Sequence, residues 1–310
     1  MAVHIINLRS PADGTGITEH PQTQPALPSG PLIVLIHGYN VTLRQSRESY
    51  ASFLNPNYDA DRINSLPPNA WGAYVDALSG DTLDSFSRWG EVCLVFWPAD
   101  VWGAEISALA YPQELNLARE SAPVLASVLQ KLPRIPRPQI ALICHSMGNR
   151  LALEMLNPAI PCRAMCLMAA AVAVEMVTGR TQPDFRSAIA GIDKTLVLYS
   201  ASDIVLGDFF AIGETLSGEG SDLVAVGSAG DPPNVWTDTK DMYPYGHTVY
   251  WSSPWSKKGT TSRDLSLNFL SATMPSYSPP SQIGSNPGPT PLAITTNVLK
   301  KHRIAKRHIG

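Results

Sequence analysis

The amino-acid sequence predicts an α/β domain whose central sheet is mainly parallel and has helices on both faces. Short, continuous apolar runs alternate along the chain with segments whose apolar residues recur at helical spacing. Continuous apolar runs are typical of parallel strands, because crossover helices bury both faces of such a sheet. The alternation of the two patterns therefore indicates strand–helix–strand crossover units.

Composition narrows the classes of protein further. The chain has 310 residues, of which 44% are apolar and 16% charged, and its formal net charge is −3. This apolar content can bury a sizeable core, and the charge provides no basic field for nucleic acid. The four cysteines are too few for a disulfide scaffold and are not spaced with histidines as in a zinc site. We therefore expect no metal and no nucleic-acid partner.

The N-terminal segment lacks a basic stretch followed by a long apolar one, and no apolar run is long enough to span a bilayer. We therefore expect a cytoplasmic protein without a membrane span. Residues 1–30 are rich in proline and are predicted to form an extended N-terminal arm, with a candidate edge strand at His4–Leu8. Residues 31–274 are predicted to form the main domain.

The first elements of this domain follow the apolar pattern. Leu32–Ile36 is fully apolar and is predicted to be a buried strand, and a helical pattern follows at residues 43–53. Val92–Trp97 is predicted to be the next strand, and it ends at a proline. The long segment between them, residues 55–90, carries several aromatic residues and is a candidate cap or lid over the site.

The second half of the domain continues the alternation. A helical stripe runs from Leu115 to Leu132, with Pro123 as a predicted kink or break, and a short helix is expected at Met147–Leu156. The further strands are predicted at Ile140–Cys144, Ala164–Ala171, Thr195–Tyr199 and, as a sixth candidate, Asp222–Val226. Residues 275–310 read as a Pro-rich linker and a basic C-terminal tail, which could contact the body, a partner or solvent alone.

The most informative segment is the turn Cys144-His145-Ser146-Met147-Gly148, which joins an apolar strand directly to a helix. Such a strand–turn–helix unit exposes a serine hydroxyl at the carboxyl edge of the sheet. The residues two before and two after the serine must be small, and Cys144 and Gly148 both are. The Met147 N–H, at the helix N-terminus, could stabilise an oxyanion. The alternatives are an ordinary turn with a capping serine and a nucleophilic Cys144, which we expect to lie in the packing under the turn.

In these motifs the sequence resembles the α/β-hydrolase fold family, over about residues 30–255. His37-Gly38-Tyr39-Asn40 follows the first apolar strand, as the oxyanion loop of the family does, and together with CHSMGNR resembles a poorly characterised bacterial branch. The resemblance implies a three-layer α/β-hydrolase fold with a mainly parallel sheet and helices on both faces. It also implies that the N–H of Tyr39 is the second oxyanion donor.

Along the chain, the catalytic residues of this family come in the order serine, acid, histidine. Asp203 follows the predicted strand Thr195–Tyr199 and is the expected acid, with Asp208 and Glu175 left as alternatives. His247 is the expected base, because the two later histidines lie in the basic tail. We expect His37, Gly38, His145 and Tyr245 to contribute to substrate binding.

These residues predict a serine hydrolase that cleaves carboxylic esters, most simply a carboxylesterase or lipase. The base activates the serine, and the acid holds the base in the right tautomer. The expected partner is a small ester, and the aromatic loop residues suit an acyl or aryl group unless their rings only pack the core. This chemistry needs no cofactor. Thioester cleavage, amide cleavage and acyl transfer use the same residues and remain open, as do a non-catalytic binding protein of this fold and the oligomeric state.

Overall fold

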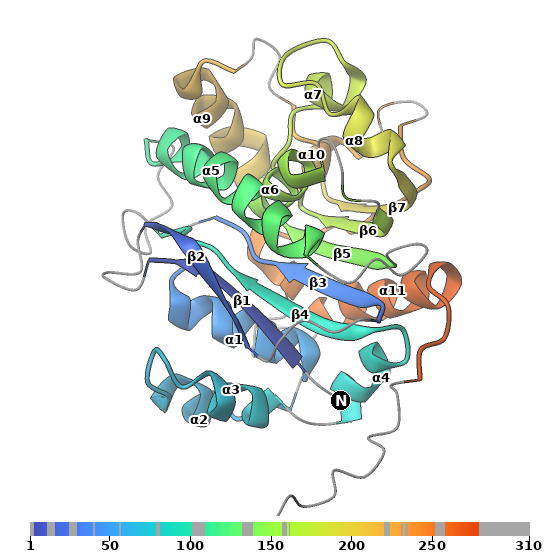
Figure 1. Cartoon of the computed structure of the whole chain (residues 1–310). Coiled ribbons are helices and arrows are strands. Elements are labelled where there is room, and N and C mark those ends of the chain that lie inside the picture. The colour runs from blue at the N-terminus through green and yellow to red at the C-terminus, as the bar shows by residue number, and fades with distance from the viewer. Residues whose placement is uncertain are drawn as a thin grey trace, which may run out of the picture. The chain divides into compact units, whose positions relative to one another are not determined.

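A computed structural model describes most of the chain (Figure 1). The described residues are 3–10, 16–24, 30–39, 41–55, 57–78, 81–100, 109–131, 139–156, 160, 162–219, 224–230, 232, 235–251 and 258–278. The predicted basic tail and most of the Pro-rich linker, residues 279–310, lie outside these ranges.

The strands that the structure describes form one eight-stranded sheet in the order β2-β1-β4-β3-β5-β6-β7-β8. Every neighbouring pair is parallel except β1 and β2. The strands are β1 Val3–Arg9, β2 Ile17–Gln24, β3 Leu32–Ile36, β4 Glu91–Phe96, β5 Ile140–His145, β6 Cys162–Met168, β7 Ile192–Tyr199 and β8 Asp238–Asp241. The predicted fold class, an α/β fold with a mainly parallel sheet, is therefore confirmed.

Helices cover both faces of this sheet (Figure 1), with α1, α4 and α11 on one face and α5 and α6 on the other. In the first half of the chain, the described helices are α1 Leu43–Leu54, α2 Ala60–Ser65, α3 Trp71–Leu78, α4 Asp81–Ser87, α5 Tyr111–Gln130 and α6 Met147–Leu156. The later ones are α7 Val174–Thr178, α8 Arg186–Ala190, the π-helix η1 Val205–Phe209, α9 Phe210–Ser217, α10 Val226–Ala229, the 3-10 helix η2 His247–Trp251 and α11 Lys258–Thr273. The helix α5 continues through Pro123 without a break.

The N-terminal residues differ from the predicted extended arm. They form two strands, and the strand expected at the edge, β1, lies inside the sheet between β2 and β4. Ile5, Ile6 and Leu8 of β1 are buried, as an interior strand requires. The polar strand β2 takes the edge position and pairs antiparallel with β1.

The segment 55–90 does not form a cap over Ser146 in its described part. It folds into α2, α3 and α4, and its large aromatic residues pack into the core. Trp71 and Tyr74 contact Phe96 of β4, with ring centroids 4.9 and 6.1 Å away, and Phe86 contacts Phe53 of α1 at 5.7 Å. These rings therefore stabilise one face of the sheet.

The strand predicted at Asp222–Val226 is wrong. Asp222 lies outside the described residues, Ala225 makes only an isolated bridge with Ala173, and Val226 begins the helix α10. The last described strand is β8, whose sequence Asp-Thr-Lys-Asp contains no apolar residue and so produced no apolar run. Among the described helices, none is both long enough and apolar enough to cross a membrane.

Candidate active site

The serine predicted as nucleophile lies in the turn between β5 and α6. Its φ of 52° falls in the left-handed region, which is strained for a residue with a side chain. Gly148 makes the turn possible, because a Cβ there would lie 2.5 Å from the carbonyl oxygen of His37. Gly38 is equally confined, since a Cβ there would lie 2.8 Å from Cβ of Ser146. The turn and the loop after β3 therefore pack directly on each other.

Asn149, in the first turn of α6, binds this turn from below. Its Nδ2 donates to the carbonyl oxygens of Ser146 and Met168, at 3.0 and 3.1 Å. The backbone N–H of Ser146 donates to Met168 as well, at 3.0 Å. The side chain of Asn149 thus connects the serine turn to the end of β6.

Ser146, His247 and Asp203 form one chain of hydrogen bonds. The Oγ of Ser146 lies 2.7 Å from Nε2 of His247, and Nδ1 of His247 lies 2.8 Å from Oδ2 of Asp203. An ionised carboxylate only accepts, so Nδ1 carries the proton and Nε2 is left free to accept from the serine hydroxyl. The three residues lie at the carboxyl ends of β5 and β7 and at the start of η2.

Asp203 is the carboxylate that contacts the histidine. It is only 1% exposed, and its other oxygen, Oδ1, accepts from the backbone N–H of Leu206 at 3.1 Å. Of the two alternatives, Asp208 is exposed on η1 and Glu175 lies half-buried on α7. Asp203, which the order of residues along the chain predicts as the acid, is therefore the carboxylate that contacts His247.

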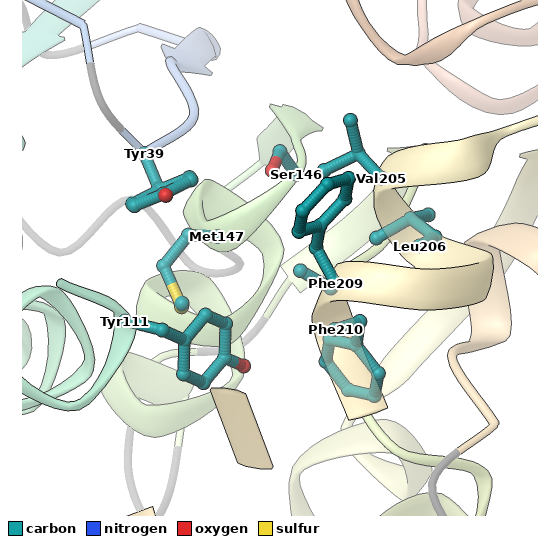
Figure 2. Close-up of a pocket in the computed structure, with 9 residues that line it drawn as sticks. Tyr39, Tyr111, Ser146, Met147, Val205, Leu206, Phe209 and Phe210 are labelled. Atoms are coloured by element: carbon teal, nitrogen blue, oxygen red, sulfur yellow. The ribbon is translucent and has the colours of Figure 1, made fainter. Parts of the chain in front are cut away.

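A cavity opens beside the serine hydroxyl (Figure 2). Its empty space is about 340 Å³, part of which is open to solvent. The described residues that line it are Tyr39, Tyr111, Ser146, Met147, Ala171, Val205, Leu206, Phe209 and Phe210. None of these side chains is charged, so the wall is apolar apart from three hydroxyl groups.

Residues 22–191 match a protein family described as alpha/beta hydrolase of unknown function (DUF900). The chain belongs to this alpha/beta hydrolase family. The match spans the loop after β3 and the serine turn, which are the two segments that carry the resemblance in the sequence.

Solved structures similar to this alpha/beta hydrolase include several enzymes of low identity. The esterase PE8 is 17% identical, with 79% of this chain and 93% of that chain covered and a TM-score of 0.40. The carboxylesterase CesB from Bacillus subtilis is 10% identical, with 79% and 85% covered and a TM-score of 0.37. A dipeptidyl peptidase 4 from Porphyromonas gingivalis is 12% identical, with 78% and 31% covered and a TM-score of 0.36. At these TM-scores the neighbours carry no information on activity, and no curated protein matches the sequence.

The four residues expected to bind substrate lie around Ser146, Asp203 and His247 of this alpha/beta hydrolase and are not among the described residues that line the cavity. His37 is buried between Tyr50 and Trp97, and its ring stacks on Trp97 at 5.6 Å. Its Nδ1 donates to the carbonyl oxygen of Gly38 at 2.9 Å, which shapes the start of the predicted oxyanion loop. Burial lowers the pKa of His37 to about 3, so this imidazole is neutral at ordinary pH.

His145 contacts the backbone of His247 directly. Its Nε2 donates to the backbone carbonyl oxygen of His247 at 2.8 Å, and the two rings lie 5.1 Å apart. Burial, aided by His247, holds the pKa of His145 well below its usual value. Tyr245 is also buried and packs against Tyr250 of η2, with ring centroids 5.2 Å apart. Both residues therefore stabilise the segment that carries His247.

Sequence reasoning missed most of the cavity wall. Tyr111 opens α5, and Leu206, Phe209 and Phe210 follow the acid on η1 and α9. The signal in the sequence was the apolar stretch directly after Asp203, since residues that follow the end of a parallel strand lie near the carboxyl edge of the sheet. Asn40, in the predicted oxyanion loop, lies outside the described residues.

A polar cluster, formed by Tyr111, Arg119, Arg150, Glu154, Glu214 and Glu219, lies behind the cavity wall. Arg119 and Glu154 are partly exposed, and the other four residues are buried. The Tyr111 hydroxyl donates to the Glu214 carboxylate, and Arg119 pairs with Glu219. Arg150 is fully buried and lies 2.9 Å from Glu219 and 3.0 Å from Glu154. The cluster joins α5 and α6 to α9 and to Glu219, two residues after the end of α9.

The rival nucleophile, Cys144, is unsuited to the role. It is fully buried in β5, and burial raises the pKa of its thiol well above the usual value. It therefore stays protonated and has no access to the cavity. In the part of the chain that the structure describes, no group of three or more His, Cys, Asp or Glu side chains could hold a metal ion.

Proposed function

We propose that this alpha/beta hydrolase cleaves carboxylic esters through an acyl-enzyme formed on Ser146. The observation that carries the proposal is the hydrogen-bonded chain from Ser146 Oγ through His247 to Asp203, at 2.7 and 2.8 Å. A serine hydroxyl is a poor nucleophile at neutral pH and needs an adjacent base that is held in the correct tautomer. The two short contacts of His247, to Ser146 and to Asp203, support both conditions.

In the first half-reaction, Oγ attacks the ester carbonyl carbon and its proton passes to Nε2 of His247. The π electrons of the carbonyl move to its oxygen, which becomes an oxyanion. We propose the backbone N–H groups of Met147 and Tyr39 as its donors, at the start of α6 and in the loop after β3. Loss of one such donor typically costs about 3 kcal/mol of transition-state stabilisation.

The oxyanion then collapses, the bond from carbon to the alcohol oxygen breaks, and Nε2 gives its proton to the leaving alcohol. A water molecule repeats the sequence on the acyl-enzyme, with His247 again taking and returning the proton, and releases the acid. The buried Asp203 stabilises the imidazolium that forms in both steps.

The test is steady-state hydrolysis of p-nitrophenyl butyrate by wild type and by Ser146→Ala. We expect kcat/KM to fall by at least about 10³-fold in the variant, because the acyl-enzyme cannot form. Equal rates for the two proteins would contradict the proposal. A wild type that neither hydrolyses oxygen esters, thioesters and amides nor reacts with a fluorophosphonate would favour the non-catalytic binding protein.

A further inference from the structure

The cavity beside Ser146 lies on one definite side of the reacting centre. The departing alcohol has to take its proton from Nε2 of His247, so it leaves on the side of the histidine. The carbonyl oxygen has to face the N–H groups proposed for the oxyanion. Among the described residues, Tyr39 and Met147 line the cavity and His247 does not.

We infer that this cavity receives the acyl part of the ester and that Phe210 and Tyr111 set the longest acyl chain that it accepts. The inference rests on the proposed function, since it assigns the two halves of the proposed substrate to different sides of Ser146.

The two rings close the cavity on the side away from Ser146 (Figure 2). Their centroids lie 5.9 Å apart and their planes are perpendicular. Tyr111 is 5% exposed and Phe210 is 2% exposed, so both rings are packed on their outer sides. An acyl chain that enters past Ser146 meets these rings end-on.

The Tyr111 ring has no room to move aside. The Tyr111 hydroxyl is held by the buried Glu214 carboxylate. The ring also packs directly on Gly213, where a Cβ would lie 2.4 Å from Cγ of Tyr111. Phe210 and Gly213 are on the same helix, α9, so one rigid contact between α5 and α9 forms the end wall.

The chemistry of the wall selects neutral acyl chains. The hydroxyl of Tyr111 is engaged behind the wall, and the charged side chains of the polar cluster pair with one another there. A carboxylate on the acyl chain would lose its hydration without gaining a positively charged partner from the described wall residues. The substrate class is therefore esters of neutral, apolar acids.

The experiment is a kcat/KM profile of p-nitrophenyl esters from acetate to dodecanoate. Phe210→Ala opens the end wall, and Ala171→Leu fills the cavity from the end of β6. The matched control is Ile212→Ala, on the same helix but 51% exposed and outside the cavity wall. We expect Phe210→Ala to gain at least about tenfold on the shortest chain that wild type rejects, since one methylene is worth that much in a pocket. Ala171→Leu should lose a similar factor on longer chains, and Ile212→Ala should match wild type.

A second comparison needs only wild type. After subtraction of spontaneous hydrolysis without enzyme, kcat/KM for the hydrogen succinate ester should be at least about tenfold lower than for the butyrate ester of the same length. If Phe210→Ala fails to fold by circular dichroism, Phe210→Leu replaces it with the same expected direction.

Active variants with an unchanged length profile, or equal rates on succinate and butyrate, would overturn the inference while leaving the proposed function intact. No hydrolysis by wild type together with no fluorophosphonate labelling of Ser146 would instead overturn both.

Discussion

Asn149 uses its amide group to hold two backbone carbonyl groups, those of Ser146 and Met168. Both carbonyls lie at the carboxyl edge of the sheet, where the chain turns sharply. Ser146 itself adopts a φ of 52°, and Ala169, just after β6, adopts 43°. Strained positions of this kind persist only when their surroundings hold them, and Asn149 is part of that support.

We expect Asn149→Ala to lower the free energy of unfolding by about 1–3 kcal/mol, because two buried carbonyl oxygens lose a donor. Chemical denaturation measures this directly. The same variant should lower kcat more than it raises KM, since the misplaced group is the nucleophile. If Asn149→Ala has the same free energy of unfolding and the same kcat as wild type, the amide group of Asn149 is not needed to hold the turn.

As Asn149 does for Ser146, His145 holds a backbone carbonyl group, in this case that of His247. We expect His145→Ala to lower kcat by about 10- to 100-fold, because a small displacement of the base weakens proton transfer strongly. His145→Gln retains a side-chain N–H donor and should recover part of the loss. If both variants have the wild-type kcat, His145 does not position the base.

At the level of single residues, the sequence predicted the contact between Ser146, Asp203 and His247. The order of serine, acid and histidine along the chain leaves few residues that could be the acid or the base. It did not predict the contacts of Asn149 or His145. Both side chains bind backbone atoms of distant segments, and residue identity in one sequence does not specify which carbonyl lies opposite.

The helix α9 packs closely on α5, where Gly213 faces the Tyr111 ring. We expect Gly213→Ala to lower the free energy of unfolding by about 1–3 kcal/mol, because the new Cβ overlaps the Tyr111 ring. Gly207→Ala is the matched control, since a Cβ there meets nothing within 4 Å. Thermal melting of both variants tests this, and equal melting temperatures would contradict the packing described for α5 and α9.

Strands with continuous apolar runs were predictable from sequence, and β3 to β7 all lie where such runs occur. The edge strands β2 and β8 were not, because their residues are polar and their stability comes from pairing with a buried neighbour. The segment 55–90 was predicted as a candidate cap for a different reason, its aromatic residues. Aromatic residues alone do not indicate whether a segment packs against the sheet or covers a site.

For the molecule as a whole, the buried histidines predict a loss of stability in acid. His37 has a folded-state pKa of about 3, below the usual 6.5 of the unfolded chain, so the unfolded state binds more protons between these values. Its contribution is fully present above about pH 6.5 and is lost progressively as the pH falls toward 3. His145 has a lowered pKa as well and adds to the effect.

We expect the free energy of unfolding of wild type to fall by up to about 1.4 kcal/mol per pH unit for His37 alone within this window. His37→Gln should show a shallower dependence, measured by denaturant unfolding at several pH values. Parallel pH dependences in wild type and variant would contradict a neutral, buried His37.

The layered fold of the whole molecule followed from the alternation of apolar strands and amphipathic helices, but the cavity did not. Its wall combines residues from the loop after β3, α5, the serine turn, the end of β6, η1 and α9. Only the folded packing of the helices on the sheet brings these segments together.

Fluorophosphonate labelling, followed by mass spectrometry of the digested protein, directly measures whether Ser146 is the activated nucleophile. We predict one phosphonyl adduct, on the peptide that contains Ser146, and strongly reduced labelling in His247→Ala, which lacks the base. An unlabelled Ser146, or an adduct on another residue, would contradict the account.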